Sequence, residues 1–337
     1  MIIKLCSQNE IPQLIEFLKE FWNPNHVLVN HTELLMWQYE NENDGLNFLI
    51  AKDENSDSIL AILGFIPLSH YDASLAHHKE IWGAVWRVSP NCRIPGLGTY
   101  LQKKICAEYD FYAGLGISSD SVHIQKSLAV KILNSNQYFL LNSNIADYQI
   151  AEVSDRFIPN TIERNCNFEL QEIFDVSKYR LNHSYHPVKS ILFLKNRYEK
   201  HPWYEYHFLG CFIEGEICCI LVYRKITVEN RSVIRIVDAY GNLNPLMGLG
   251  YKLQEFFMDK SDEIEYVDFC NYGIDPDFFF RNGFNLLDTD SKDIIIPHYF
   301  EPFVKKNIAL QGVIIAKEDK NYTFFKADAD QDRPNIL

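Results

Sequence analysis

One cation and two glycines stand at a spacing that could bind a phosphate. They lie in the run Arg93-Ile94-Pro95-Gly96-Leu97-Gly98-Thr99. Glycine lets the backbone approach an anion without a Cβ in the way, and the free N–H groups of a helix's first turn favour negative charge. An arginine beside them would add a charge-assisted hydrogen bond. The run therefore predicts an anion-binding loop.

The flanking sequence predicts a strand before this loop and a helix after it. Residues 81–88 are mostly β-branched, aromatic or small apolar residues without helical spacing, which is typical of a strand. Pro90 interrupts the run, because proline lacks the donor that a strand ladder needs. Residues 99–105 follow as an amphipathic helix. This strand–turn–helix unit would direct a helix N-terminus at the anion.

Two common nucleotide motifs do not fit the run. A Walker loop would have lysine where Thr99 stands, and the dinucleotide fingerprint would have a third glycine in place of Leu101. The run instead resembles the pyrophosphate loop of the GNAT superfamily of acyl-CoA-dependent N-acyltransferases, Arg/Gln-x-x-Gly-x-Gly/Ala after the fourth strand. Arg93, Gly96 and Gly98 match that motif.

The resemblance implies acetyl-CoA as co-substrate, with no metal. It implies that the end of the strand and the loop hold the cofactor, through Trp86, Arg87, Val88, Arg93, Ile94, Pro95, Gly96, Leu97, Gly98 and Thr99.

The predicted elements of the first 145 residues follow the order of the GNAT fold. They are strand, two helices, three strands, loop, helix, strand, helix and strand, at residues 1–5, 11–22, 32–39, 46–52, 59–68, 80–88, 99–105, 110–117, 122–133 and 138–141. The family's fourth helix carries asparagine, alanine and tyrosine where Lys126, Ala129 and Leu133 stand here. That tyrosine commonly protonates the leaving thiolate of CoA, so its role is vacant or filled from elsewhere.

The second half repeats the pattern. Strand-like and helical runs occupy residues 168–174, 188–198, 207–213, 217–223 and 233–237, and a shift of 152 residues lays Gly96-Leu97-Gly98 on Gly248-Leu249-Gly250. Such self-similarity indicates a duplicated domain. The position of Arg93 is taken by Pro245, so the second loop has lost its charge.

We therefore expect an α/β fold of two tandem GNAT-like domains, each a mixed, mostly antiparallel sheet flanked by helices. Residues 1–150 would be the acyl-CoA-binding catalytic domain and residues 151–167 a linker. Residues 168–337 would be a degenerate copy for substrate binding or scaffolding. The alternative is that both glycine loops are purely structural.

Acyl transfer to an amine needs a base for the ammonium proton, polarisation of the carbonyl, and departure of the thiolate. In the resembling family, N–H groups of the fourth strand polarise the thioester, and the base is commonly a carboxylate on that strand. Glu80 shares a face with Trp82, Ala84 and Trp86 by the period of two and is the first candidate. His123 and Asp238 are further catalytic candidates. A solvated strand start, a surface histidine or a loop-capping aspartate would account for the same residues.

The composition limits the class of protein. The chain has 337 residues, 47% hydrophobic content, a net charge of −13 and a pI near 5.3, which argue against a nucleic-acid partner. Its eight cysteines include no C-x-x-C pair, which is typical of reduced thiols in the cytoplasm. No signal peptide and no membrane-spanning run is expected.

Residues 326–335 carry alternating acids. A calcium loop would need a glycine after the third acid, but Arg333 follows, so calcium is not expected. The acids could hold a cationic amine or sugar hydroxyls, or form a solvated terminus. The tail is similar to the end of tandem enzymes that acetylate amino sugars for bacterial surface polysaccharides. The aromatic run at residues 201–207 could stack on a sugar or lie in an interface.

The interpretation with most support is an acetyl-CoA-dependent N-acetyltransferase. It would act by direct attack in a ternary complex on a small amine, a nucleotide-linked amino sugar of polysaccharide biosynthesis. Two rivals remain: a tandem-fold aminoacyl or peptidyl transferase of cell-wall assembly, and a non-catalytic acyl-CoA-binding scaffold.

Overall fold

The computed structural model describes residues 1–128, 130–183, 185–259, 261, 263–298 and 304–334. The first half builds a sheet in the order β1 (Ile2–Cys6), β2 (Leu46–Lys52), β3 (Ile59–Pro67), β4 (Glu80–Val88) and β5 (Phe111–Leu115). Neighbouring strands are antiparallel, except that β4 and β5 are parallel. Apolar residues of α1 (Ile11–Phe21) and α3 (Thr32–Tyr39) cover one face, beside α2 (Val27–Asn30), and those of α4 (Leu97–Glu108) cover the other.

The second half repeats this plan. Its strands run β8 (Glu169–Ile173), β9 (His207–Ile213), β10 (Glu216–Val228), β11 (Arg231–Gly241) and β12 (Ile264–Tyr272). Again only the fourth and fifth strands are parallel. The helices are α6 (Ile191–Leu194), continued by a π-turn at Lys195–Glu199, α7 (Leu249–Leu253), continued at Gln254–Met258, and α8 (Pro276–Arg281). The expected α/β fold of two tandem units, each a mixed, mostly antiparallel sheet flanked by helices, is confirmed.

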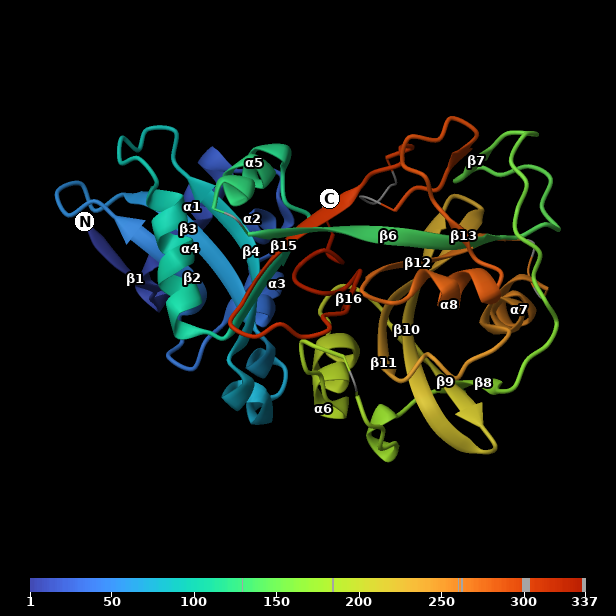
Figure 1. Cartoon of the computed structure of the whole chain (residues 1–337). Helices are drawn as coiled ribbons and strands as arrows, with labels where there is room; N and C mark the ends of the chain where they lie inside the picture. The colour runs from blue at the N-terminus through green and yellow to red at the C-terminus, as the bar shows by residue number, and fades with distance from the viewer. Residues whose placement is uncertain (129, 184, 260, 262, 299–303, 335–337) are drawn as a thin grey trace.

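The halves exchange strands. Strand β6 (Lys131–Leu141) pairs with β15 (Leu310–Ala316) through its first part and with β12 through its last part, so it crosses from one half to the other (Figure 1). Strand β15 comes from the end of the chain and inserts between β5 and β6. The expected division at residues 150 and 168 is therefore crossed by β15, and both halves form one continuous sheet.

Short elements complete the structure. Strand β13 (Asn285–Leu286) pairs with β6, β7 (Glu152–Val153) with β14 (Ile294–Ile295), and β16 (Phe324–Phe325) with β12. Tight helical turns lie at Gln8–Glu10, Leu68–His70, Ala73–His78 and Val176–Lys178. In the described part of the chain, every helix is too short or too polar to cross a membrane.

The predicted helix at residues 122–133 was wrong in its extent. Helix α5 covers Ser119–Ser127, and Leu133 lies in strand β6, opposite Gly312 of β15. Local periodicity did not reveal strand β6, because this strand pairs with residues from far along the chain. Leu133 therefore does not occupy the helical position of the family's tyrosine, and Ala129 lies outside the described residues.

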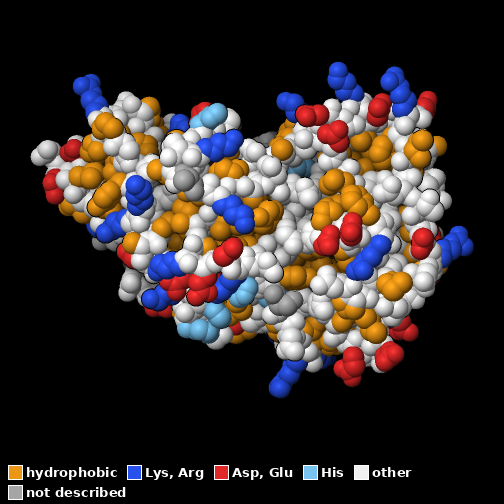
Figure 2. All heavy atoms as spheres, in the orientation of Figure 1, with side chains coloured by type: hydrophobic (Ala, Val, Ile, Leu, Met, Phe, Trp, Pro, Cys, Tyr) orange, Lys and Arg blue, Asp and Glu red, His pale blue; other side chains and the backbone are white. Residues whose placement is uncertain are grey.

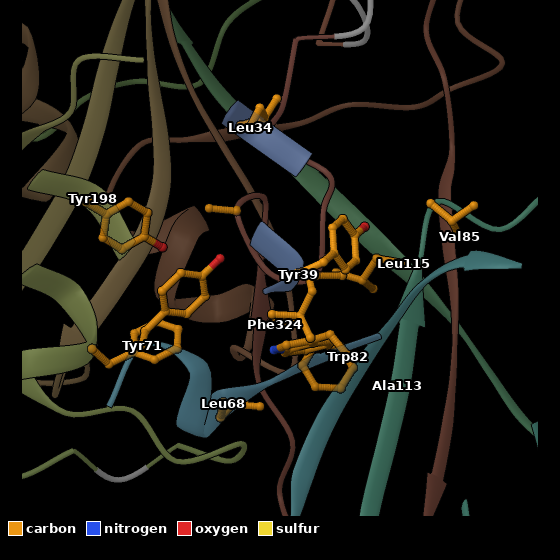
Figure 3. Packing of buried hydrophobic residues seen from close by; sticks show 14 of the residues in the cluster. Leu34, Tyr39, Leu68, Tyr71, Trp82, Val85, Ala113, Leu115, Tyr198 and Phe324 are labelled. Carbon is orange, nitrogen blue, oxygen red and sulfur yellow. The ribbon is translucent and has the colours of Figure 1, made fainter. Parts of the chain in front are cut away.

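One apolar cluster joins the halves. Tyr39, Tyr71 and Trp82 of the first half pack in the same cluster as Tyr198 and Phe324 of the second (Figure 3). The rings of Trp82 and Phe324 lie 5.0 Å apart. Because the cluster and the exchanged strands both cross the boundary, neither half buries its core alone.

Candidate functional site

Strands β4 and β5 separate at Gly83. Their parallel pairing runs from Glu80 opposite Phe111 to Gly83 opposite Gly114, and β4 then continues to Val88 paired with β3 and no longer with β5. A cavity of about 470 Å³ opens at this splay. Its walls come from β4, β5, β15, α5 and the end of α1: Trp22, Gly83, Ala84, Trp86, Arg87, Val88, Tyr112, Gly114, Leu115, Gly116, Ile117, Ser118, Asp120, Ser121, Ile124, Gln125 and Val313.

A β-bulge shapes the wall of this cavity. Leu63 of β3 lies opposite Trp86 and Phe65 lies opposite Gly83, so β4 has one extra residue between them. A bulge leaves a residue unpaired and reverses which face the following side chains take. The expectation that Trp86 shares a face with Glu80 and Trp82 was therefore wrong. Trp82 packs on the α1–α3 side, whereas Trp86 packs on the α4 side.

The glycine loop lies at the N-terminus of α4 and is open to solvent. Gly96 has a φ of 73°, which favours glycine, and a Cβ built on it would meet nothing within 4 Å. The first helical bond is from the N–H of Tyr100 to the carbonyl of Gly96. The three preceding N–H groups, at residues 97–99, are thus the orphan donors of a helix start.

Gly98 has a different role, because it lets α4 approach β4 closely. The indole N–H of Trp86 donates to the Gly98 carbonyl at 3.0 Å. A Cβ on Gly98 would lie 2.9 Å from the Trp86 Nε1 and from the Val88 Cγ2. Of the predicted cofactor residues, Trp86, Arg87 and Val88 line the cavity. Residues 93–99 form the loop at the start of α4, and their part in binding stays a prediction.

Sequence reasoning missed three polar residues at the splay. The hydroxyl of Tyr112 lies over Gly83, so that a Cβ on Gly83 would be 2.1 Å from it, and burial raises the pKa of this phenol. Gln125 donates to Gln102 at 3.0 Å. The Gln125 Oε1 is buried and has no partner among the described residues, whereas the Gln102 side chain lies within hydrogen-bonding reach of the Tyr112 hydroxyl. The only signal in the sequence was polar residues on otherwise apolar element faces.

Glu80 lies at the start of β4 and does not line the cavity. Its side chain is buried, accepts the N–H of Val188 at 2.8 Å, and lies 3.9 Å from the Nδ1 of His186. Desolvation raises the pKa of this carboxyl to about 7. A carboxyl with such a pKa can accept a proton near neutral pH.

The other two catalytic candidates are not brought to the cavity. His123 is exposed on α5. Asp238 is fully buried in the second half, where Lys189 donates to it at 2.7 Å and the hydroxyl of Tyr198 also donates. Asp238 thus lies in an enclosed ion pair of the second half and does not line the cavity between β4 and β5.

The corresponding splay of the second half is filled by the chain itself. Strands β11 and β12 pair in parallel up to Ile236 opposite Phe269. Beyond that point β16 pairs with β12, and the N–H of Ala327 donates to the carbonyl of Val237. A remaining cavity of about 830 Å³ at the end of β12 is partly walled by the same tail segment, at residues 320–323.

The acidic tail is a buried element, not a solvated terminus. Asp328 forms an ion pair with Lys189 at 2.8 Å, and Asp332 forms one with Arg224 at 2.8 Å. Both aspartates are at most 3% exposed. The alternating acids do hold cations, but the cations belong to the protein.

No family model and no curated protein matches the chain. Several solved structures are similar to the chain. A GCN5-related N-acetyltransferase from Anabaena variabilis shares 10% identity, covers 93% of this chain and 72% of its own, and has a TM-score of 0.53. One from Kribbella flavida shares 8%, with coverages of 93% and 71% and a TM-score of 0.51. A conserved protein of unknown function from Enterococcus faecalis shares 9%, with coverages of 92% and 72% and a TM-score of 0.51.

These likenesses show the fold. The chain has the fold of GNAT N-acetyltransferases, and the repeated strand pattern shows that it is present twice.

Proposed function

We propose that this protein transfers an acetyl group from acetyl-CoA to the amine of a nucleotide-linked amino sugar. The observation that supports the proposal is the open splay between β4 and β5, with a glycine loop and free helix N–H groups beside it. In the second half the equivalent splay is filled. One cofactor per chain is therefore expected.

In this mechanism the amine attacks the thioester carbonyl directly in a ternary complex. The N–C bond forms, the C–S bond breaks, and CoA leaves as a thiolate. The loop at residues 93–99 would hold the pyrophosphate, and the unpaired backbone of the β4 bulge would polarise the carbonyl. The amide oxygen of Gln125, which lines the cavity and has no partner among the described residues, suits an amide N–H of the pantetheine arm.

Two proton transfers complete the reaction. Tyr112 would protonate the thiolate, a role supported by the position of its hydroxyl over Gly83, where the strands separate. Tyr112 would therefore be the general acid, a role for which the resemblance named no residue in this chain. Glu80 would accept the ammonium proton through a chain of several waters, since it lies three residues before the splay, ~10 Å along the strand, which is farther than one water can span.

The amino-sugar assignment is supported by aromatic residues between the halves. His31 and Trp203 rings lie 4.4 Å apart, and Trp37 and His201 rings lie 4.5 Å apart. The rival that uses charged tRNA is disfavoured by the net charge of −13. On the face in Figure 2, Lys and Arg side chains are interspersed with Asp and Glu.

The test has two parts. Calorimetry with acetyl-CoA should give about one site per chain; two equivalent sites would contradict the asymmetry of the splays. CoA release should then be followed with nucleotide-linked amino sugars, free amino sugars, amino acids and polyamines. Binding without turnover of any amine would support the scaffold interpretation.

A further inference from the structure

Four buried polar atoms without a hydrogen-bond partner among the described residues lie where the halves meet. They are the Gln38 Nε2, the Tyr39 and Tyr71 hydroxyls and the Arg197 Nη1. Gln38 and Tyr39 end α3, and Tyr71 follows the turn after β3. Arg197 comes from the π-turn after α6 in the second half. The site therefore needs both halves.

These groups are neighbours. The guanidinium carbon of Arg197 lies 5.4 Å from the ring centre of Tyr71 and 5.1 Å from that of Trp37. The Tyr39 hydroxyl lies within electrostatic range of Arg197 and Tyr71, and the Gln38 side chain lies within reach of a weak hydrogen bond to it. Arg197 itself is 2% exposed.

Each of the four atoms can donate a hydrogen bond, and the two tyrosine hydroxyls can also accept one. A guanidinium and an amide nitrogen cannot accept one. Arg197 makes a single weak bond, from Nη2 to the Ala327 carbonyl at 3.4 Å. The adjacent acid, Asp332, is held by Arg224 and Tyr206 instead. A buried guanidinium without a carboxylate is unfavourable unless an anion joins it.

The tail connects this group to the cavity at the splay. The side chain of Gln331 lies against Gly116 in the cavity wall, where a Cβ would be 2.1 Å from its Oε1. Arg333 lies 3.4 Å from His26 and within electrostatic range of Tyr39.

We propose that Arg197, with Gln38, Tyr39 and Tyr71, binds an anionic group of the acceptor, a carboxylate or a phosphate. The inference rests on the proposed acetyl transfer and specifies its substrate class: amines that also carry an anion. An amino sugar would qualify through its phosphate, and an amino acid through its carboxylate.

The test uses acceptors that differ only in the anion: glucosamine with glucosamine 6-phosphate, and 2-phenylethylamine with phenylalanine. The full-length protein should prefer one anionic member at least tenfold in kcat/KM, and the pair that shows the preference identifies the anion. Arg197→Gln should remove that preference by raising KM for the anionic member. The Kd of acetyl-CoA should not change.

Two further variants show whether a change in KM comes from lost anion binding or from misfolding. Tyr71→Phe keeps the ring and removes one donor, so KM for the anionic acceptor should rise severalfold at an unchanged melting temperature. Arg180→Gln removes an exposed arginine of the same half and should have no effect. Equal losses for both members of a pair, or an unaffected Tyr71→Phe, would make Arg197 a structural cation in an aromatic cage.

The anion site and the proposed acetyl transfer can be tested independently of each other. If no amine is acetylated, calorimetry with glucosamine 6-phosphate and phenylalanine still tests the anion site, by comparing the parent with Arg197→Gln. Anion binding that depends on Arg197 would then support the site while the acetyl-transfer proposal fails. No binding of either probe would overturn the site.

Discussion

The two glycine loops have the same backbone and different surroundings. Gly96 and Gly248 both precede a helix with φ values of 73° and 79°. A Cβ on Gly96 would meet nothing within 4 Å, whereas one on Gly248 would lie 2.4 Å from the Asn165 carbonyl. The segment before β8 thus covers the second loop. The two loops share one backbone geometry, and Gly96 is open to solvent whereas Gly248 is covered.

The two splays differ in the same way. A splayed strand pair exposes unpaired backbone groups, which must find partners in a ligand, in water or in the protein. In the first half they line a cavity. In the second half, β16 supplies the partners, and Lys189 between Asp238 and Asp328 fixes the tail in place. The same architecture therefore opens on a cavity of about 470 Å³ in the first half, whereas in the second half the tail fills part of the splay and leaves a cavity of about 830 Å³ beside it.

The largest effect is expected for Glu80→Gln. A positioned base contributes ~10²–10⁴-fold, so turnover should fall by about that factor while acetyl-CoA affinity is kept. In the parent, kcat/KM should rise with pH through about 7, the pKa of Glu80, and the variant should lack that rise. An unchanged rate would remove Glu80 from the mechanism.

The same variant gives a stability control. The folded carboxyl has a pKa of about 7 against an ordinary 4.5, so between these values the folded protein binds more protons than the unfolded chain. The free energy of unfolding should therefore fall as pH rises through this window, by up to about 3 kcal/mol. Glu80→Gln should be the more stable protein at pH 8, and the two should converge below pH 4.5.

Phe324→Ala tests the filled splay. Phe324 is 1% exposed and packs on Trp82 and Tyr272 at ring distances of 5.0 and 5.6 Å. Removing a buried phenylalanine costs about 3–5 kcal/mol, which urea unfolding would measure. Exposed Phe174→Ala is the matched control and should cost little. A small effect of Phe324→Ala would mean that the tail does not stabilise the second half.

Much of the fold could be predicted from sequence because it rests on local patterns. The first five strands, α1, α4 and the second glycine loop follow from periodicity, punctuation and self-similarity. The exchange of β6 and β15 could not be predicted, since Leu310 pairs with Ser135, and no short-range signal encodes such a partner.

Part of the candidate site could also be predicted from sequence, because that part rests on a local pattern. Arg93, Gly96 and Gly98 form a contiguous motif, and their loop lies where the motif implies. Tyr112, Gln102 and Arg197 carry no motif, and only packing brings them to the splay or the interface. The β4 bulge misled the face assignment of Trp86, because one inserted residue inverts a period of two.

Arg93→Glu tests whether the first loop binds a pyrophosphate. Arg93 is exposed beside the start of α4, and a hydrogen bond to a charged group contributes roughly 1.5–3 kcal/mol. Reversal of the charge adds repulsion, so the Kd of acetyl-CoA should rise at least tenfold. Arg164→Glu, an exposed arginine elsewhere, should leave the Kd unchanged. Equal affinity for parent and Arg93→Glu would exclude a pyrophosphate loop.

The smallest and most direct comparison is Gly96→Ala against Gly248→Ala. Both place alanine at a left-handed φ, which costs roughly 1–2 kcal/mol. Only Gly248→Ala also drives its Cβ into a neighbouring carbonyl, so it should lower the melting temperature more than Gly96→Ala does. Binding should show the reverse order, because only the first loop is open to an anion. Gly96→Ala should weaken acetyl-CoA severalfold, and Gly248→Ala should leave its Kd unchanged. Since each variant is measured for both quantities, lost stability cannot be mistaken for lost binding. Weakened acetyl-CoA binding in a folded Gly248→Ala would show that the covered loop takes part after all.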